Sequence, residues 1–390
     1  MIPDLSELDA YLERTGADGY LIEADGTDSD QRYLSGFTAP DPFVTLYTGD
    51  VHLLVSTLEY GRAVRNARAE SVARYADYDH RANVDTHGQT RGGHRTLAAF
   101  LEDHGVDDVA VPTAFPVGTA DGIRELGVSV SADYDDVVES IRAVKTDEEI
   151  EHIRETQRAN QRAMTRAEEL LRSADVEDSV LVHEDEPLTS ERVKEEIEIT
   201  LLRNGCALDE TIVACGADAA DPHDRGSGPL EAGESIIVDI FPRSKETGYY
   251  GDLTRTFCVG EPSETIAEWY ELTAEAKAAA LDALGPGISG SDVHDVVCDI
   301  YENAGIPTLR ADENAETGFI HTTGHGVGLD IHEYPRVSTQ HNELEPGHVV
   351  TIEPGIYDPE VGGVRIEDLV VITDDGYENL TDYPERLRIS

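Results

Sequence analysis

The chain has 390 residues, of which 39% are apolar, and its formal net charge is −50. This length suits two domains with buried cores. The acidic balance argues against binding nucleic acid through a basic surface, and no apolar run reaches the 18 residues that would indicate a membrane span.

The negative charge is spread along the whole chain rather than collected in a tail. Only four residues are lysine, namely Lys145, Lys194, Lys245 and Lys277. At molar salt the Debye length falls to about 3 Å, so the self-repulsion of such a surface is screened. We therefore hypothesise a protein from a cytoplasm that accumulates salt. The alternative is a local acidic docking surface.

The cysteines and the N-terminus both favour a reducing compartment. The four cysteines stand singly, without CxxC spacing, and are expected to be reduced thiols: Cys206, Cys215, Cys258 and Cys298. The first residues have neither the basic region nor the apolar region of a signal peptide. We expect a cytoplasmic protein.

Helical and strand patterns alternate over the first 138 residues. The spacing of apolar residues predicts helices over 5–15 and 95–104 and strands over 19–22, 44–47, 51–55 and 109–111. This alternation predicts an α/β domain, and it contains no phosphate-binding loop or nucleotide fingerprint.

The pattern changes near residue 139, where we place the boundary between two domains. A charged helix is predicted over 135–173, followed by an acidic surface insertion over 174–190. Further helices are predicted over 192–204, 263–284 and 292–304, the last two with Ser263 and Asp292 as N-caps. Residues 139–390 therefore mix helices and strands in an order other than simple βαβ.

A predicted hairpin places two aspartates in β-strand sequence. Asp239 interrupts the apolar strand 236–241, and Asp252 lies in the next predicted strand on the same face as Thr254 and Thr256. An ionised carboxylate in an apolar strand is costly unless it is paired or bound to a metal. The alternative is a pair of ordinary acids at strand ends.

Three further motifs follow the hairpin. His321, His325 and His332 fall within 12 residues, among three glycines that allow tight turns beside a ligand. Glu353 ends a predicted strand before Pro354-Gly355. Arg365 and Glu367 share one face of a predicted strand, although such a pair is commonly just solvated.

Together these motifs resemble the pita-bread metallopeptidases, the family of Xaa-Pro dipeptidase (prolidase), aminopeptidase P and methionine aminopeptidase; creatinase shares their fold. The resemblance covers most of residues 135–390 and includes residues 141–150 at the start of the catalytic domain. Residues 32–37 resemble the N-terminal domain of the longer members, which favours the prolidase and aminopeptidase P branches. The resemblance implies a creatinase-like α/β domain over 1–138 and an α+β pita-bread catalytic domain over 139–390.

The resemblance also implies a dinuclear metal site. Its ligands would be Asp239, Asp252, His325, Glu353 and Glu367, with Asp252 and Glu367 bridging the two ions. Four carboxylates this close cannot all stay ionised unaided. Oxygen ligands with one imidazole suit Mn²⁺, Co²⁺ or Zn²⁺, of which we expect Mn²⁺.

The same family assigns the remaining polar residues to the substrate. His223, His321, His332 and Arg365 would bind or orient it, His332 would stabilise the oxyanion, and Glu353 would carry a proton. The implied reaction is hydrolysis of Xaa-Pro bonds in small peptides by a hydroxide that bridges the metals. Relatives of this type are commonly homodimers, so we expect one here.

Three alternatives remain open. An aminopeptidase P-like enzyme would act on longer peptides, a creatinase-like amidinohydrolase would work without metal, and an inactive pita-bread protein would bind a partner. The complete ligand set argues against the last two. One departure from the family pattern affects the pocket: many members carry a glycine two residues after the first aspartate, where this chain has Phe241 in a turn that is longer by two residues.

Overall fold

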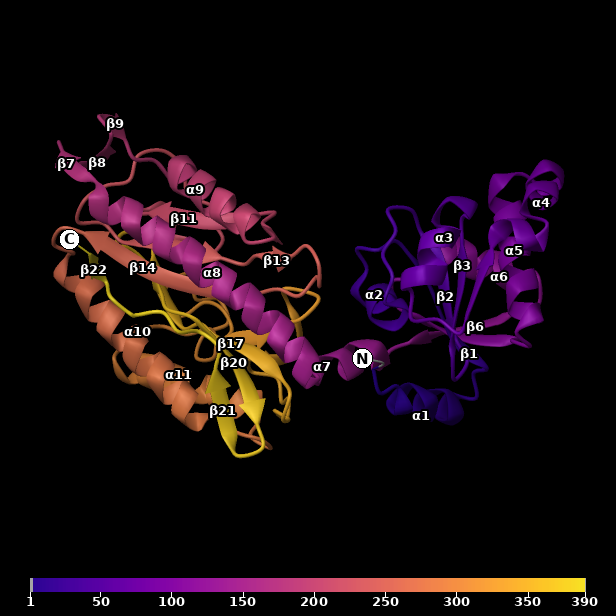
Figure 1. Ribbon diagram of the computed structural model, residues 1–390. Coiled ribbons are helices and arrows are strands. Elements are labelled where there is room, and N and C mark those ends of the chain that lie inside the picture. The colour runs from indigo at the N-terminus through magenta and orange to yellow at the C-terminus, as the bar shows by residue number, and fades with distance from the viewer. Residues whose placement is uncertain (1–2, 390) are drawn as a thin grey trace. The chain divides into compact units, whose positions relative to one another are not determined.

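The computed structural model describes residues 3–389. The chain divides into two compact units, Met1–Arg142 and Ala143–Ser390. The boundary that we place after residue 138 falls inside helix α7 (Val137–Ala143), which contains the junction between the units. Figure 1 shows the elements of each unit.

The first unit is an α/β domain built on a mixed six-stranded sheet of order β4-β3-β2-β1-β5-β6. Strands β1, β5 and β6 are parallel, as are β3 and β4, whereas β2 runs antiparallel to both of its neighbours. The strands are β1 (Gly19–Ala24), β2 (Phe43–Tyr47), β3 (Val51–Val55), β4 (Ser71–Arg74), β5 (Asp108–Pro112) and β6 (Ser129–Asp133).

Helices of this unit bury apolar faces against the sheet. Leu97, Phe100 and Leu101 of α5 pack with Leu21 and Val109 of the strands. The helices are α1 (Ser6–Thr15), α2 (Ser29–Ser35), α3 (Thr57–Asn66), α4 (His80–His87), α5 (Gln89–Asp103) and α6 (Val117–Arg124). Helix α5 begins six residues earlier than predicted.

The second unit is built on two antiparallel sheets. One has the order β11-β12-β14, with the short β22 added in parallel, and the other has the order β16-β15-β17-β20-β21. The strands are β11 (Thr211–Cys215), β12 (Ile236–Ile240), β14 (Leu253–Val259), β22 (Arg388–Ile389), β15 (Gly324–Gly326), β16 (Glu333–Val337), β17 (Val349–Ile352), β20 (Asp368–Thr373) and β21 (Gly376–Asn379).

Each sheet has its own pair of covering helices. Helices α8 (Asp147–Ser173) and α9 (Ser190–Arg203) share a core with the first sheet, and α10 (Glu264–Ala283) and α11 (Gly290–Asn303) share one with the second. In Figure 1, β11 and β14 lie between α9 and α10. The second unit therefore contains two sheets, each supported by its own core.

Short strands complete the unit. Residues 174–190, predicted as a surface insertion, contain a three-stranded sheet of β7 (Asp175–Glu177), β8 (Val180–His183) and β9 (Glu186–Pro187). Two further pairs are β10 (Cys206–Ala207) with β13 (Arg243–Ser244), and β18 (Gly355–Asp358) with β19 (Gly362–Arg365). Over residues 3–389, no helix combines the length and the apolar character needed to cross a bilayer.

Two helix predictions were wrong in detail. The helix expected over 135–173 is interrupted between α7 and α8, because Thr146 caps α8 and forms a reciprocal capping box with Glu149. The N-cap of α11 is Ser289 rather than Asp292, and its hydroxyl accepts a hydrogen bond from the Ser291 N–H at 3.2 Å. In both cases a hydroxyl satisfies an amide at the start of the helix.

The segment between α7 and α8 contributes a buried ion pair to the second unit. The ammonium of Lys145 contacts the carboxylate of Glu333, and both side chains are fully buried. Glu333 also accepts the backbone N–H of Asp330 and directly follows His332. The pair therefore ties the loop that carries His332 to the beginning of the second unit.

Replacing Lys145 with methionine should take the Lys145 charge away from the buried Glu333 carboxylate, at a cost of about 3–5 kcal/mol in the free energy of unfolding. The double variant Lys145→Met, Glu333→Gln should recover much of this loss. Removing the exposed pair of Arg154 and Glu378 with Arg154→Met is the control, for which we expect about 1 kcal/mol or less. Denaturant titration measures all three, and equal losses for Lys145→Met and Arg154→Met would contradict the assignment.

Candidate metal centre

Strand pairing in the first sheet brings two of the predicted ligands together. Asp239 of β12 lies opposite Thr254 of β14. Asp252 directly precedes the first residue of β14, Leu253. The two-residue extension of the turn thus keeps both aspartates at the site. The side chain of Thr254 faces the same way and donates its hydroxyl to Glu367 at 2.7 Å.

The second sheet supplies the histidine. His325 is the middle residue of β15, between Gly324 and Gly326. A Cβ atom on Gly324 would lie 1.9 Å from the backbone oxygen of Thr351, and one on Gly326 would lie 2.4 Å from that of Tyr334. These glycines serve the close approach of neighbouring backbone rather than the turn beside a ligand that we expected.

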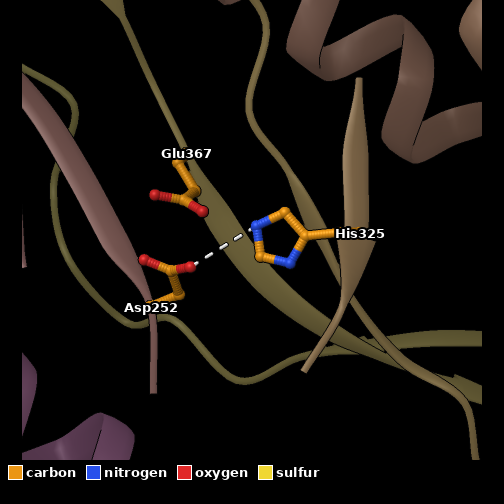
Figure 2. A group of neighbouring side chains, drawn as sticks. All are labelled: Asp252, His325 and Glu367. Atoms are coloured by element: carbon orange, nitrogen blue, oxygen red, sulfur yellow. Dashed lines mark ion pairs between the residues drawn. The ribbon is translucent and has the colours of Figure 1, made fainter. Parts of the chain in front are cut away.

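The two glutamates follow strands of the same half. Glu353 comes directly after β17, and Glu367 lies between β19 and β20. The Nε2 atom of His325 is 3.3 Å from Glu353 Oε1 and 3.7 Å from Asp252 Oδ2. Figure 2 shows Asp252 and Glu367 directed at this imidazole. One ligand atom from each of these three residues lies within 4.8 Å of the other two.

A single cavity of about 630 Å³ contains every predicted site residue. Its lining includes the five predicted ligands, Asp239, Asp252, His325, Glu353 and Glu367, together with His223, His321, His332 and Arg365. Two stretches of the chain, residues 210–241 and 321–336, supply most of the lining, and Asp252, Glu353, Arg365 and Glu367 supply the rest.

Burial and mutual repulsion hold the carboxyl groups toward their protonated forms. Burial raises the pKa of Glu353 from 4.5 to about 8, with Asp239 adding to the rise. Burial also raises the pKa values of Asp252 and Glu367 well above their usual range, and neighbouring acids raise them further. A cluster of this kind becomes fully ionised only when positive charge is brought to it.

His325 presents a lone pair to these acids. Burial lowers its pKa to about 3, so the imidazole is neutral at physiological pH. Its Nδ1–H donates to the Gly326 carbonyl at 3.1 Å, which leaves Nε2 unprotonated and facing Asp252 and Glu353. Once the acids are ionised, a lone pair facing them is unfavourable without a cation between the groups. This is the orientation a metal-binding imidazole adopts.

Two buried oxygens supply a second test of the fit to metal. Asp239 Oδ1 and Glu367 Oε1 are inaccessible to solvent and have no hydrogen-bond partner within residues 3–389. An unsatisfied buried polar atom normally costs about 1–3 kcal/mol, and more when it is charged. The donor set, of carboxylate oxygens and one imidazole nitrogen, is the one expected for a first-row divalent ion.

Tyr357, a residue that we did not predict, links Arg365 to His321. The guanidinium of Arg365 donates to Asp239 Oδ2 at 2.6 Å and to the Tyr357 hydroxyl at 2.7 Å. Burial lowers the pKa of His321 to about 3, and its Nδ1–H donates to the Thr322 carbonyl, so its Nε2 accepts from Tyr357 at 3.1 Å. Tyr357 thereby fixes the orientation of both Arg365 and His321.

A buried charge network supports the opposite face of the same strands. The guanidinium of Arg255, which is 1% exposed, donates to the Glu367 carbonyl at 2.5 Å, to the Thr254 carbonyl at 2.9 Å and to the Asp368 carboxylate at 2.9 Å. The ammonium of Lys277 contacts the other Asp368 oxygen at 2.6 Å. The backbones that carry Asp252 and Glu367 are therefore tied to each other from behind.

Several cavity residues escaped the sequence analysis. They are Glu210, Ile212, Pro222, Arg225, Thr322, Ile331 and Arg336. Tyr357, which contacts the cavity residue Arg365, was also missed. A signal existed for Tyr357, because Gly355 and Gly363 flank its ring and a Cβ on either would approach it to within 2.5–2.9 Å. No local pattern identifies Arg225 or Arg336, whose place at the cavity depends on how distant segments pack.

The comparisons with known proteins agree with this geometry. Residues 151–374 match metallopeptidase family M24, and residues 5–144 match the creatinase/prolidase N-terminal domain. The chain belongs to metallopeptidase family M24. The predicted family and fold class, an α/β N-terminal domain with a pita-bread catalytic domain, are confirmed.

Three proteins similar to this M24 chain are named as Xaa-Pro dipeptidases or as an X-Pro aminopeptidase. A curated Xaa-Pro dipeptidase from Pyrococcus furiosus is 36% identical over 253 residues, which cover 63% of this chain and 65% of that protein, just under two thirds of its length. The solved Xaa-Pro dipeptidase from Bacillus anthracis superposes with a TM-score of 0.83 at 26% identity, covering 99% of both chains. The solved X-Pro aminopeptidase from Thermotoga maritima gives 0.79 at 25% identity, covering 97% of this chain and all of that one.

The raised carboxyl pKa values predict how the stability of the metal-free M24 protein depends on pH. A carboxyl whose pKa is raised in the folded state stabilises the fold while protonated, and this contribution is lost as the pH rises through the folded pKa. For Glu353 that interval runs from 4.5 to about 8. The buried neutral histidines act with the opposite sign below about pH 6.5, so we expect the free energy of unfolding to fall between about pH 7 and about pH 9.

Denaturant titration in the presence of a chelator, at fixed salt, measures this decline. Glu353→Gln should flatten it, because the amide does not titrate. A free energy of unfolding that rises over the same interval would contradict the assignment.

Proposed function

We propose that the protein is a dinuclear metallopeptidase that hydrolyses the bond between an N-terminal residue and a following proline in small peptides. The observation that carries the proposal is the convergence of four acids and one lone-pair imidazole on a single cavity, in a chain of family M24. The Xaa-Pro dipeptidases among its relatives support the choice of bond.

Five residues would hold the two metal ions. Asp252 and Glu367 would bridge them, Asp239 would hold one, and His325 with Glu353 would hold the other. We propose Mn²⁺ as the native ion, with Co²⁺ or Zn²⁺ as substitutes for the same donors. When bound, the ions supply Lewis acidity at the scissile carbonyl and acidify a water molecule.

The chain's own residues would position the substrate and move the proton. Glu353 lines the cavity, and its carboxylate would take up a proton during attack and deliver it to the leaving nitrogen. Burial and the nearby Arg336 lower the pKa of His332, so a neutral imidazole at the cavity mouth would donate to the developing oxyanion. His223 is exposed on the loop at Pro222 and would reach the substrate from the part of the lining formed by residues 210–241.

The leaving nitrogen of proline has no N–H, so its recognition depends on shape. Ile331 and Pro222 offer apolar surface in the cavity for the ring. Arg336 lines the same cavity and has no acidic partner within residues 3–389. In a chain this acidic, a guanidinium without an acidic partner at this place suits the C-terminal carboxylate of the proline in a Xaa-Pro dipeptide.

With added Mn²⁺, we therefore expect a Xaa-Pro dipeptide to be hydrolysed faster than the matching Xaa-Pro-Xaa tripeptide. Arg336→Met should lower kcat/KM for the dipeptide by about 10- to 100-fold, chiefly by raising KM. Steady-state kinetics on both peptides measures this. A preference for the tripeptide that Arg336→Met leaves unchanged would favour the aminopeptidase P-like alternative.

Glu367→Ala should remove a bridging carboxylate and with it both metal binding and activity, with a loss of at least about 10³-fold in kcat/KM. Glu378→Ala is the matched control, because Glu378 is an exposed acid on β21 outside the cavity. Wild-type turnover by the Glu367 variant would refute the ligand set.

We also propose that the protein works as a homodimer in a cytoplasm rich in salt. The charge of −50 and the four cysteines, free of disulfides within the described residues, support a reducing, salty compartment. The homodimer rests on the resemblance alone.

The fold should accordingly be lost on dialysis from about 3 M to about 0.1 M KCl and regained on return, because only the higher salt screens the surface charge. Circular dichroism follows the transition, and sedimentation equilibrium in high salt gives the mass. Equal stability in both salts would contradict the halophilic proposal.

A further inference from the structure

Helix α8 buries three polar side chains on the face that it turns toward the strands. Most of its buried positions are small or apolar, but Thr156, Gln157 and Asn160 fall among them. A buried polar side chain is costly unless it is hydrogen-bonded, so each of these needs a partner in the fold. The partners lie in and next to the strands β12 and β14, and Figure 1 shows α8 beside β14.

The side-chain amide of Gln157 pairs with the backbone of Asp252. Its Nε2 donates to the Asp252 carbonyl at 2.7 Å, and its Oε1 accepts the Asp252 N–H at 3.0 Å. Pairing between β12 and β14 ends at Leu253, so the amide takes the place of a strand partner at the residue before β14. Gly251 permits this contact, because a Cβ atom there would lie 2.7 Å from Gln157 Oε1.

The same amide reaches the second bridging carboxylate through Thr381. Gln157 Nε2 also donates to the Thr381 hydroxyl at 2.9 Å, and that oxygen accepts the N–H of Leu369 at 2.9 Å. Leu369 lies in β20, two residues after Glu367. Asp252 leads into the first sheet and Glu367 into the second, so one buried amide links the backbones that carry both.

We propose that Gln157 is a positioning residue that sets the separation of the two bridging carboxylates, and that Thr381 extends its hold to the second of them. This inference rests on the proposed function and deepens it by naming a support of the dinuclear centre outside the cavity lining. Hydrogen-bond partners behind metal ligands typically contribute about 10- to 100-fold to metal affinity or activity.

The test is the metal binding of Gln157→Met, which keeps the length of the side chain and removes the amide. Loaded with Mn²⁺, the wild type should give the electron paramagnetic resonance spectrum of two exchange-coupled ions. The variant should bind the second ion about 10- to 100-fold more weakly and give the spectrum of isolated Mn²⁺ at limiting metal. In saturating Mn²⁺, kcat for a Xaa-Pro dipeptide should fall while KM stays close to that of the wild type, because the substrate contacts remain.

Thr381 provides a matched pair of variants. Thr381→Val removes the hydroxyl and should also weaken the second ion, whereas Thr381→Ser keeps the hydroxyl and should retain wild-type binding. Gln161→Met is the control on the same helix. Gln161 is half-buried one turn beyond Gln157 and donates to the Leu380 carbonyl at 3.3 Å, so its loss should leave Mn²⁺ binding unchanged.

The outcomes separate this inference from the function beneath it. If Gln157→Met binds and couples both ions like the wild type, or loses no more affinity than Gln161→Met, the positioning role is wrong while the peptidase stands. If Gln157→Met does not fold, equal Mn²⁺ binding by Thr381→Val and Thr381→Ser would overturn the inference. If the wild type itself holds no pair of ions and hydrolyses no Xaa-Pro dipeptide, the proposed function is wrong and the inference falls with it.

Discussion

The structure depends on one electrostatic constraint, the confinement of four carboxyl groups and the unprotonated nitrogen of His325 in one cavity. Burial, together with the neighbouring acids, drives the pKa values of Asp252, Glu353 and Glu367 upward. The lone pair of the imidazole adds to the repulsion instead of relieving it. Only cations placed between these groups reconcile the geometry with ionised ligands.

The surrounding fold is arranged to maintain this unfavourable gathering. The two sheets have separate cores under separate helices, so each delivers its ligands from a rigid support. Arg255 and Lys277 neutralise Asp368 behind the bridging carboxylates, and Arg365 and Tyr357 restrain Asp239 and His321 in front of them. Strand alternation separates the two systems, because consecutive residues such as Glu367 and Asp368 face opposite sides.

Much of the site could be predicted because its residues sit in short patterns. A carboxylate within an apolar strand and three histidines among glycines have few structural explanations, and the order of these motifs resembles one family. The interpretation of the glycines was less successful, since Gly324 accommodates the Thr351 backbone rather than a ligand. Local pattern shows that a side chain is absent, but the fold decides what occupies its place.

The residues that shape the cavity were beyond such reasoning. Arg336, Arg225 and Glu210 are common residue types in polar sequence, and only tertiary packing brings them to the cavity. The break between α7 and α8 was missed because the helical pattern continues across it, while a single threonine decides where the helix restarts. Phe241 was visible as a departure from the family pattern, yet the position of the Arg225 guanidinium over its ring depends on a loop distant in sequence.

The central claim is that these ligands hold a pair of divalent ions, and counting the metal tests it most directly. Protein equilibrated with Mn²⁺, freed of excess by gel filtration and analysed by plasma mass spectrometry should carry about two ions per chain, as a carboxylate-bridged dinuclear site requires. A protein that folds and retains no ion, or binds Mn²⁺ no better than a chain with Asp252 and Glu367 both replaced by alanine, would contradict the account.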